Sequence, residues 1–559
     1  MKRIRMKKSV SLFLAVVMVI LCIPMTVIET SAMTEGRFTY VITDGGAIIT
    51  KVDNNSKGEI VVPDSLGGYP VNRIGSEAFR GCEYIYHITI PDSVTSIGML
   101  AFYECTRLKK ITVTEGNPAY KSVDGVLFTI DGETIVCYPA GRTDAEYSVP
   151  ADVRTVGDHA FAWCSSLKDI TIPDSVKSIG SSAFYYCTGL SEITVPEGVE
   201  VIEEFVFFGC SGLVDVIIPE GVTEIKTQAF SYCTGITDVV IPDSVKSLGS
   251  AFSHCTSLEN INVPDTVTDI DQYVIYNTAY YNDPLNWDNG VLYIGKHLIT
   301  ADGTVNGEYT VKDGTLNIAN SAFYACADLV SVTVPEGVKN IGKQAFMWCE
   351  KLKRVDLPEG LVNIGKDAFA LCIKLTDINI PDSVTYIGEG VFRICNSLGN
   401  VNIPEGITKI EKYTFAGCIL NEVIIPEGVT EIGDNAFENC KKLTNITISA
   451  GVTNIGKDVF FGCDNVTVRC YTNSVAHKYV VDNNIPYIRI DADSAVYHGD
   501  ADGDGKINLT DVALILKYIA KWDVAPDLDT ADVTGDGKVN LADASRILQY
   551  IAKWDVTFK

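Results

Sequence analysis

The sequence predicts a repeat solenoid of short parallel strands, followed by a small all-α module. Two observations predict this architecture. A 23-residue pattern recurs through most of the 559 residues, and a 12-residue acidic loop occurs twice near the C-terminus. The chain is far longer than one hydrophobic core usually holds, so a stack of small units accounts for its length.

Composition narrows the classes of partner. The chain holds 45 Lys and Arg against 71 Asp and Glu, a net charge of −26, and 47% of its residues are hydrophobic. Nucleic acids and anionic membranes favour a basic face, so the charge argues against both. Calcium, basic proteins and neutral glycans are all compatible with it.

The first residues have the pattern of an export signal. Lys2 and Arg3 open a basic start, an uncharged apolar run extends from Val10 to Ile28, and Ala32 offers a cleavage point. We expect residues 1–32 to be a cleaved signal peptide and the mature protein to be secreted. The alternative is an uncleaved anchor, since the run is nearly long enough to span a bilayer. No second apolar span follows, so we expect attachment to a cell surface to depend on a partner.

The repeat is clearest in three consecutive copies, which begin at Ile170, Ile193 and Val216. Sixteen copies, some of them imperfect, can be counted. The other well-aligned copies begin at Ile60, Ile88, Ile111, Tyr147, Tyr309, Val332, Val355, Ile378, Val401, Val423 and Ile446.

Each copy has the same internal order. The alternating Ile170 and Ile172 predict a short strand, which the following proline ends because proline cannot donate to a ladder. A turn, a second short apolar segment and the Ala183–Phe184 pair come next. One coil cannot bury these residues alone, but stacked coils form a continuous core with strands in a parallel ladder.

Fourteen of the 17 cysteines occupy one position of the repeat. Metal binding needs clustered ligands at CxxC-like spacing, which is absent. Disulfides are expected in exported proteins, but a uniform column offers no natural pairing. We expect small buried thiols stacked coil on coil. The positions are Cys82, Cys105, Cys164, Cys187, Cys210, Cys233, Cys255, Cys326, Cys349, Cys372, Cys395, Cys418, Cys440 and Cys463.

These features resemble the BspA-like group of the leucine-rich repeat superfamily over about residues 34–491. The resemblance implies a solenoid over residues 33–463, with short parallel strands and irregular or 3-10 convex segments. Insertions near 114–146 and 275–308 interrupt the period and share the motifs Asp124–Phe128 and Asn289–Tyr293. We expect them to be hairpins that project from the coil. Residues 464–491 resemble the closing cap of the group, a short helix and a last strand.

The sequence has no recognisable catalytic motif. HExxH, GxSxG, P-loop and GxGxxG patterns are absent, and the six histidines are scattered. We expect the protein not to be an enzyme. A glycoside hydrolase stays open as an alternative, because a pair of catalytic carboxylates cannot be dismissed by counting acids.

One candidate ligand strip of the solenoid is acidic. Asp169, Glu192, Asp215 and Asp238 recur just before the first inward strand position and predict a ladder of carboxylates. The ladder could bind a cationic or hydrogen-bonding ligand. It could equally keep the sheet soluble and prevent aggregation.

A second candidate strip is aromatic. Trp163, Tyr186, Tyr232 and Trp348 each precede a repeat cysteine, as does His254. These side chains could stack on sugar rings or peptides. They could equally pack between the coils.

The duplicated acidic loops have the spacing of calcium ligands. Calcium prefers about six to eight hard oxygen ligands and a glycine that turns the loop sharply. The first loop would use Asp500, Asp502, Asp504, Lys506, Asn508 and Asp511, with Gly505 at the turn. The second would use Asp532, Thr534, Asp536, Lys538, Asn540 and Asp543, with Gly537 at the turn. We expect two calcium ions, bound more weakly in the second loop, where Thr534 replaces an acid or amide.

The same helix pattern follows each loop. The apolar residues recur at helical spacing and predict one buried stripe on each helix. The two stripes are Val512, Ile515, Leu516 and Ile519, then Ala544, Ile547, Leu548 and Ile551.

A duplicated loop and helix without a leading helix resembles the type I dockerin module, over residues 492–559. The resemblance implies calcium-dependent folding and binding to a cohesin module on a scaffolding protein, as in cellulosomes. The positions that match the cohesin-facing residues of the family are Leu509, Thr510, Lys517, Lys521, Leu541, Ala542, Gln549 and Lys553. The near-symmetry of the two copies suggests two binding orientations, unless Thr510 against Ala542 decides between them.

The resemblances imply a non-catalytic adhesion or recognition subunit of an extracellular, cellulosome-like complex that degrades polysaccharides. The solenoid would contact plant polysaccharide or a surface protein. A second hypothesis is a protein-binding subunit that recognises a protease, an inhibitor or a host protein. A third is an unrecognised polysaccharide hydrolase.

Overall fold

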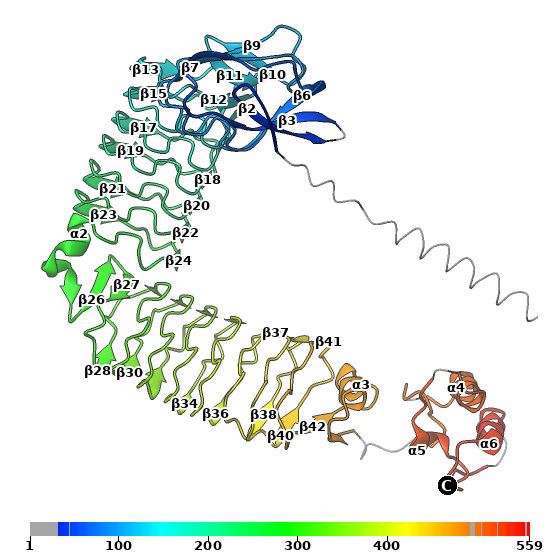
Figure 1. Cartoon of the computed structure of the whole chain (residues 1–559). Helices are drawn as coiled ribbons and strands as arrows, with labels where there is room; N and C mark the ends of the chain where they lie inside the picture. The colour runs from blue at the N-terminus through cyan, green and yellow to red at the C-terminus, as the bar shows by residue number, and fades with distance from the viewer. Residues whose placement is uncertain are drawn as a thin grey trace, which may run out of the picture. The chain divides into compact units, whose positions relative to one another are not determined.

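The computed structural model describes residues 32–43, 45–491, 498–504, 506–522, 524–553 and 556–558 (Figure 1). Residues 1–31 of the expected signal peptide and Gly505 lie outside the described residues. The chain divides into two compact units. One runs to Ser244 and includes Ala251–Asn260, and the other comprises Val245–Ser250 and the residues from Ile261 onward. Within the described residues, every helix is too short or too polar to cross a membrane.

The first unit begins with an antiparallel meander, which the repeat pattern does not predict. Its strands are β1 (Met33–Glu35), β2 (Phe38–Thr43) and β3 (Gly46–Val52). Strand β3 then pairs in parallel with β6 (Tyr69–Ile74), so the meander joins the ladder of the coils. The buried residues of β2 and β3 pack in the same core as the first coils, so the meander covers residues that would otherwise be exposed at the end of the stack.

Each regular coil contributes a strand to two separate parallel ladders. In the first ladder β13 (Glu146–Ser148) pairs with β15 (Asp169–Thr171), and Tyr147 lies opposite Ile170. In the second, β14 (Thr155–Val156) pairs with β16 (Ser178–Ile179), and Val156 lies opposite Ile179. The inward side chains are buried and their neighbours on the strand are exposed, which is the predicted alternation.

The remaining strands of the first unit are β4 (Gly58–Val61), β5 (Ser65–Leu66), β7 (Ile85–Ile90), β8 (Ser96–Ile97), β9 (Lys110–Val113), β17 (Glu192–Thr194), β18 (Val201–Ile202), β19 (Asp215–Ile217), β20 (Glu224–Ile225) and β21 (Asp238–Val240). Strand β23 (Asn260–Asn262) lies at the boundary between the units.

The convex segments are irregular turns that hydrogen-bond from coil to coil. The amides of Ser182, Phe184 and Tyr186 donate to carbonyls of the next coil over 2.8–3.0 Å. The phenylalanines of these segments form a buried stack; for example, the ring centroids of Phe161 and Phe184 lie 5.0 Å apart, with 13° between the planes. The solenoid with irregular convex segments is therefore as predicted.

The repeat cysteines are buried free thiols, as expected from their uniform spacing. Many of these thiols donate a hydrogen bond to a phenylalanine carbonyl of the preceding coil. Cys187 donates to Phe161 over 3.0 Å, and Cys349 donates to Phe323 over 3.1 Å. The column therefore satisfies carbonyls of the core, which is a structural role.

Both insertions form hairpins, but the expectation that they project is wrong. The first contains β10 (Tyr120–Val123), β11 (Val126–Thr129) and β12 (Thr134–Cys137), and β12 pairs in parallel with β14 of the next coil. The second contains α2 (Ala279–Asn282), a 3-10 turn η1 (Pro284–Asn286), β25 (Trp287–Asp288), β26 (Val291–Ile294) and β27 (His297–Ala301). All four residues of β26 are buried. The apolar runs are therefore integrated into the core in place of a regular coil.

The second unit is also built from two parallel ladders, in which Val332 lies opposite Val355 and Ile341 opposite Ile364. Its other repeat strands are β22 (Ser247–Leu248), β24 (Asp269–Ile270), β28 (Gly307–Thr310), β29 (Asn317–Ile318), β30 (Leu329–Thr333), β31 (Asn340–Ile341), β32 (Arg354–Asp356), β33 (Asn363–Ile364), β34 (Asp377–Ile378), β35 (Tyr386–Ile387), β36 (Asn400–Val401), β37 (Lys409–Ile410), β38 (Glu422–Ile424), β39 (Glu431–Ile432), β40 (Asn445–Thr447) and β41 (Asn454–Ile455).

The end of the solenoid contains β42 (Thr467–Cys470), helix α3 (Val475–Asp482) and β43 (Tyr487–Arg489). Strand β43 pairs in parallel with β42, and the Ser474 hydroxyl accepts from the His477 amide to cap α3. A short helix and a last strand thus lie where the sequence resembles a closing cap.

The C-terminal module, residues 498–558, holds α4 (Leu509–Ile519), α5 (Leu528–Ala531) and α6 (Leu541–Ile551). Val512 and Ile515 of α4 and Ala544 and Ile547 of α6 form its buried core. Leu516 and Leu548 were expected in the buried stripes, but they are exposed. In so small a module each helix is covered on a narrow face only, so these leucines point to solvent.

Candidate calcium loops and binding surfaces

The first acidic loop brings three carboxylates together. Asp500, Asp502 and Asp504 each place one oxygen within 4.8 Å of the others. Like charges so close repel each other unless a cation lies between them. Three carboxylate oxygens are the ligand type that calcium prefers, so the loop fits this ion.

The start of helix α4 holds the first loop in shape. Asp511 is fully buried, and its carboxylate accepts hydrogen bonds from the amides of Asp502 (3.1 Å) and Asn508 (2.8 Å). The Asn508 side chain accepts from the Thr510 amide over 2.8 Å. It also accepts from the backbone of Asp511, and together with the bond from the Asn508 amide to the Asp511 carboxylate this forms a capping box. Asp511 and Asn508, both expected as ligands, therefore also join the loop to the helix.

The second loop repeats this frame 32 residues on. The Asp543 carboxylate accepts from the amides of Thr534 (3.0 Å) and Asn540 (2.8 Å), as Asp511 does in the first loop. The Asn540 side chain accepts from the Ala542 amide and caps α6. Two loops with the same hydrogen bonds in the same frame support one common function.

The loops differ at their third position. The Thr534 hydroxyl donates to the Asp543 carboxylate over 2.9 Å, whereas Asp502 contributes a carboxylate to the cluster of the first loop. The Asp532 carboxylate accepts from the amides of Gly535, Asp536 and Gly537. Among the described residues, only the first loop brings three carboxylates within this distance.

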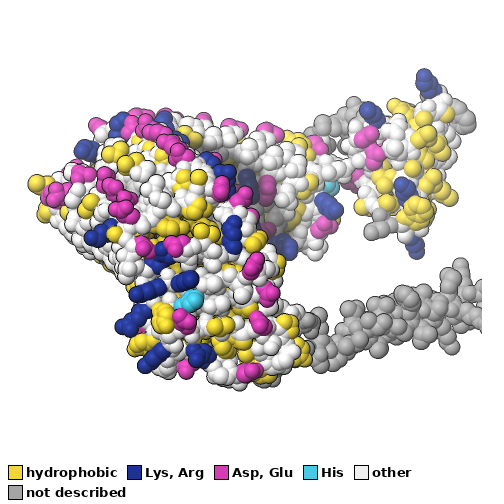
Figure 2. Space-filling model, turned by 90° about the horizontal axis from the view of Figure 1, so that it is seen from above, with side chains coloured by type: hydrophobic (Ala, Val, Ile, Leu, Met, Phe, Trp, Pro, Cys, Tyr) yellow, Lys and Arg dark blue, Asp and Glu magenta, His cyan; other side chains and the backbone are white. Residues whose placement is uncertain are grey.

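The candidate cohesin-facing residues lie on the surface of α4 and α6. Leu509 and Leu541 are 63% and 64% exposed, a high value for leucine. Thr510, Lys517, Lys521, Ala542 and Lys553 are exposed as well, and Gln549 is half-buried. Figure 2 shows exposed hydrophobic side chains gathered on this module.

The structure adds residues to this surface that the sequence reasoning missed. Leu516, Leu548 and Trp522 are exposed, and Leu516 and Leu548 are equivalent residues of the two copies. The helical spacing of Leu516 and Leu548 favoured a buried position, so the spacing concealed these two residues. The duplication itself was the available signal, because Leu509, Leu516 and Trp522 recur 32 residues later as Leu541, Leu548 and Trp554.

The acidic column forms a ladder on the exposed side of the strands. Glu192 and Asp215 lie opposite each other on β17 and β19, and Asp169 pairs with Glu146 on the other side. Asp169, Glu192, Asp215 and Asp238 are all exposed, and none makes an ion pair with a described residue. Glu146 extends the ladder and was missed because the first insertion disguises its repeat position.

The aromatic column is arranged as stacked rings. The centroids of Trp163 and Tyr186 lie 4.7 Å apart at 9°, and those of Tyr232 and His254 lie 4.4 Å apart at 10°. Within each pair the rings cover each other's faces, so they pack from coil to coil. Tyr232 and Trp348 are still 43% and 45% exposed.

Comparison with protein families agrees with this geometry. The model of the BspA type leucine-rich repeat region matches residues 59–128, 154–282, 316–441 and 395–483. The model of the dockerin type I domain matches residues 498–552. Both are non-catalytic kinds of domain, and no enzyme domain is detected. Type I dockerins bind calcium and imply binding to a cohesin module, and both domains are typical of extracellular or surface proteins.

Several solved structures are similar to the chain. A leucine rich cell surface protein from Faecalibacterium prausnitzii A2-165 is 28% identical, with 80% of this chain and 97% of that chain covered and a TM-score of 0.28. A leucine-rich repeat protein from Bacteroides ovatus ATCC 8483 is 24% identical, with 82% and 99% covered and a TM-score of 0.30. The pneumococcal vaccine antigen PcpA is 19% identical, with 82% and 98% covered and a TM-score of 0.28. The comparison with curated proteins finds no match.

The repeat model covers more than half of the chain, in agreement with the stacked coils, the phenylalanine stack and the column of thiols. The chain belongs to the BspA type leucine-rich repeat family and carries a type I dockerin domain at its C-terminal end.

Proposed function

We propose that this protein is a non-catalytic binding subunit that works outside the cell. It attaches through its calcium-loaded dockerin to a cohesin-bearing scaffold, in a cellulosome-like system that degrades polysaccharides. The convergence of Asp500, Asp502 and Asp504 in a loop that leads into α4 is the observation that carries this proposal.

Calcium would organise the module in two ways. It would neutralise the converging carboxylates, and it would hold each loop against the start of its helix. The residues of this chain contribute the oxygen ligands and the capping boxes of Asn508 and Asn540. We propose two ions, with the weaker site in the second loop because the Thr534 hydroxyl donates to Asp543.

The proposed cohesin surface exists in two copies. Leu509 and Leu541 start equivalent helices and are equally exposed, so either copy could lie at the centre of the interface. Exposed apolar side chains of this kind are candidates for the centre of a protein interface. Thr510 and Ala542 are the residues that distinguish the two orientations.

Binding to immobilised cohesin modules tests the attachment. We expect the full chain to bind at least one cohesin with calcium and to be released by EDTA. Leu509→Ala or Leu541→Ala alone should leave binding through the other copy, and the double variant should lose it. Leu528→Ala replaces an exposed leucine of α5 and is the matched control. Binding that persists in EDTA would contradict the calcium-dependent attachment.

The solenoid is proposed to provide the recognition function of the subunit. Depletion of residues 34–491 from solution by insoluble plant cell wall, with washed cells as a parallel matrix, tests its target. Binding to wall supports a role in directing the complex to polysaccharide. Binding to cells alone supports adhesion, and binding to neither contradicts both roles and favours a soluble protein partner.

A protein partner is the second candidate, and the acidic ladder from Glu146 to Asp238 favours it. Glu146 lies opposite Asp169 and Glu192 opposite Asp215, and these carboxylates make no ion pair with a residue that the structure describes, so they suit a basic partner. Binding of such a partner should weaken with salt and in the Glu192→Gln, Asp215→Asn variant. The Glu405→Gln variant, at an exposed turn outside the ladder, is the control.

Release of reducing sugar by the solenoid would contradict the non-catalytic proposal and support a hydrolase.

A further inference from the structure

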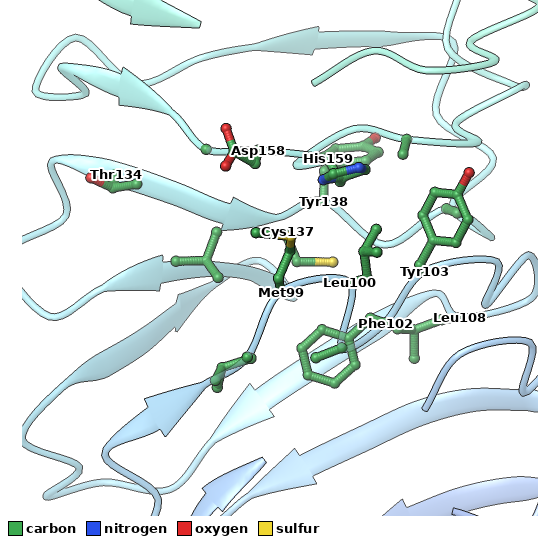
Figure 3. Close-up of a pocket in the computed structure, with 17 residues that line it drawn as sticks. Met99, Leu100, Phe102, Tyr103, Leu108, Thr134, Cys137, Tyr138, Asp158 and His159 are labelled. Carbon is green, nitrogen blue, oxygen red and sulfur yellow. The ribbon is translucent and has the colours of Figure 1, made fainter. Parts of the chain in front are cut away.

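A pocket of about 240 Å³ lies where the first insertion interrupts the coils. Met99, Leu100 and Phe102 line it from the preceding coil, and His159 lines it from the following one. Cys137 and the adjacent Tyr138, at the end of β12, complete the lining. Figure 3 shows Phe102 and Leu100 on one side and Tyr138 and His159 on the other.

The pocket lies at a break in the phenylalanine stack. On one side Phe79 and Phe102 lie 5.6 Å apart and are tilted by 41°. On the other side Tyr138 takes the place of a phenylalanine and stacks on Phe161 at 5.0 Å and 25°. No ring contact joins Phe102 to Tyr138 among the described residues, and Phe102 is half-buried while Phe79 and Phe161 are fully buried. The stack therefore lacks a ring at this point.

The backbone ladder of the convex segments is broken at the same place. In the preceding coil the amides of Glu77 and Phe79 donate to the carbonyls of Met99 and Ala101. The equivalent amides one repeat later belong to Leu100 and Phe102. Within the part of the chain that the structure describes, these two amides have no acceptor. By the pattern of the repeat they point toward the missing coil, into the pocket.

A side chain of the opposite wall is also unpaired. The Nδ1 atom of His159 is buried and has no hydrogen-bond partner among the described residues. Burial lowers the pKa of His159, which keeps the ring neutral near pH 7. A hydroxyl group can both donate and accept, so it satisfies either tautomer of this imidazole as well as a free amide.

The charge of the lining decides between neutral and ionised ligands. Asp158 belongs to the lining, and no Lys or Arg does. An anionic ring such as a benzoate would meet the Asp158 carboxylate without a compensating cation, so a neutral ligand is favoured.

We propose that this pocket binds a small neutral phenol, whose ring takes the missing place between Phe102 and Tyr138 and whose hydroxyl pairs with His159 and the free amides. The site is independent of the dockerin and of the acidic ladder. It lies within the first unit, in residues 97–162.

The test uses p-cresol and three molecules of similar size on the full chain. Cys137 reports occupancy, because it lines the pocket and is half-buried, whereas the other described cysteines are buried. We expect p-cresol to slow the alkylation of Cys137 by iodoacetamide and to give a saturation-transfer signal in NMR. Toluene lacks the hydroxyl, 4-methylcyclohexanol lacks the flat ring, and p-toluate adds a negative charge, so each should bind at least about fivefold more weakly.

Two outcomes would overturn the proposal. The first is that p-cresol neither protects Cys137 nor gives an NMR signal at millimolar concentration. The second is that toluene, 4-methylcyclohexanol or p-toluate binds as well as p-cresol, because the pocket would then not recognise the hydroxyl, the flat ring or the absence of charge, respectively.

A variant of the wall separates this site from adventitious binding. His159 has a φ of 58°, a left-handed conformation that asparagine tolerates, so His159→Asn should keep the backbone and remove the imidazole. We expect about fivefold weaker p-cresol binding in NMR. Gln228→Asn is the matched control, at the same repeat position with a φ of 58° and outside the pocket. Equal p-cresol binding by both variants would show that His159 does not contribute to the site.

Discussion

The side-chain amide of Asn317 donates a hydrogen bond to Nδ1 of His297 over 3.0 Å, in the buried core of the second unit. On the other side of the ring, Nε2 of His297 donates to the Pro264 carbonyl over 3.1 Å. A carbonyl oxygen only accepts, so the imidazole is neutral with its proton on Nε2. Asn340 donates to Asn317 and Asn363 donates to Asn340, each over 2.6 Å. The histidine therefore lies at the end of a ladder in which each side-chain amide donates in the direction of His297.

His297 should make the protein less stable in mild acid. Burial lowers the pKa of His297 despite the nearby Asp265 carboxylate, while Lys296 adds to the lowering. Below the ordinary pKa of about 6.5 the unfolded chain takes up a proton that the folded chain refuses, so stability falls as the pH falls, by at most about 1.4 kcal/mol per pH unit. Urea unfolding at pH 7.5 and 5.5 should show a smaller pH effect in His297→Gln than in the wild type. Burial also lowers the pKa of His159 and His477, so these residues add to the pH effect in both proteins. The test is therefore the difference in pH effect between the wild type and His297→Gln.

Asn340 should be a sensitive position of the amide ladder. Asn340→Ala leaves the Asn317 oxygen and the Asn363 amide without their partner, at a cost of about 2–4 kcal/mol. Hydrogen exchange of the amides in β31 and β33 measures the loss locally. Asn454→Ala is the matched control, because Asn454 holds the same repeat position but is exposed, and its effect should stay within about 0.5 kcal/mol. Equal effects of the two changes would contradict a role for the ladder.

The thiols of the cysteine column should be unreactive in the native protein. Burial raises the pKa of Cys82 and Cys326 to about 11, so these two carry little thiolate near neutral pH, and the buried position of the whole column keeps iodoacetamide away from the thiols. Iodoacetamide should label Cys137 slowly, since burial raises its pKa to about 12, and should label the column only after unfolding. Mass spectrometry of the labelled peptides identifies the sites. A column cysteine that is found oxidised in a disulfide would contradict the structural role of the thiols.

The third loop position should set the difference between the calcium sites. Thr534→Asp adds a carboxylate and removes the hydroxyl that donates to Asp543, so calcium binding in the second loop should strengthen by about tenfold. The reciprocal change, Asp502→Thr, should weaken the first loop. Calorimetric titration of both variants measures the two steps. Unchanged affinity in both variants would show that this position is not a ligand.

Local patterns of the repeat sufficed to predict most of the solenoid. The inward positions of Ile170 and Ile193, the buried Phe184 and the thiol of Cys187 all follow from spacing, because every coil makes the same contacts with its neighbours. The arrangement of the two acidic loops could also be predicted from spacing. Each loop directly precedes its helix, so the bonds that join them connect residues close together in the sequence.

Where the repeat is interrupted, the spacing no longer predicts the contacts. The hairpins of the insertions were expected to project because their length breaks the period, yet β27 pairs with β29 and is buried. Leu516 matched a buried stripe, yet it is exposed because so little of the module covers its helix. The role of Glu146 in the acidic ladder was also missed, because the first insertion breaks the period just before this residue.

The sequence by itself determined the stacked coils, the column of thiols and the spacing of the calcium loops, because the responsible contacts recur at a constant distance along the chain. The tertiary structure alone decided which aromatic rings cover each other, where the phenylalanine stack lacks a ring, and how His297 meets Asn317. The stacked rings of Trp163 and Tyr186 lie one period apart, but spacing alone does not tell whether such rings face each other or solvent. The pocket and the contact of His297 with Asn317 lie where insertions interrupt the period, and the packing of the insertions against the coils forms them.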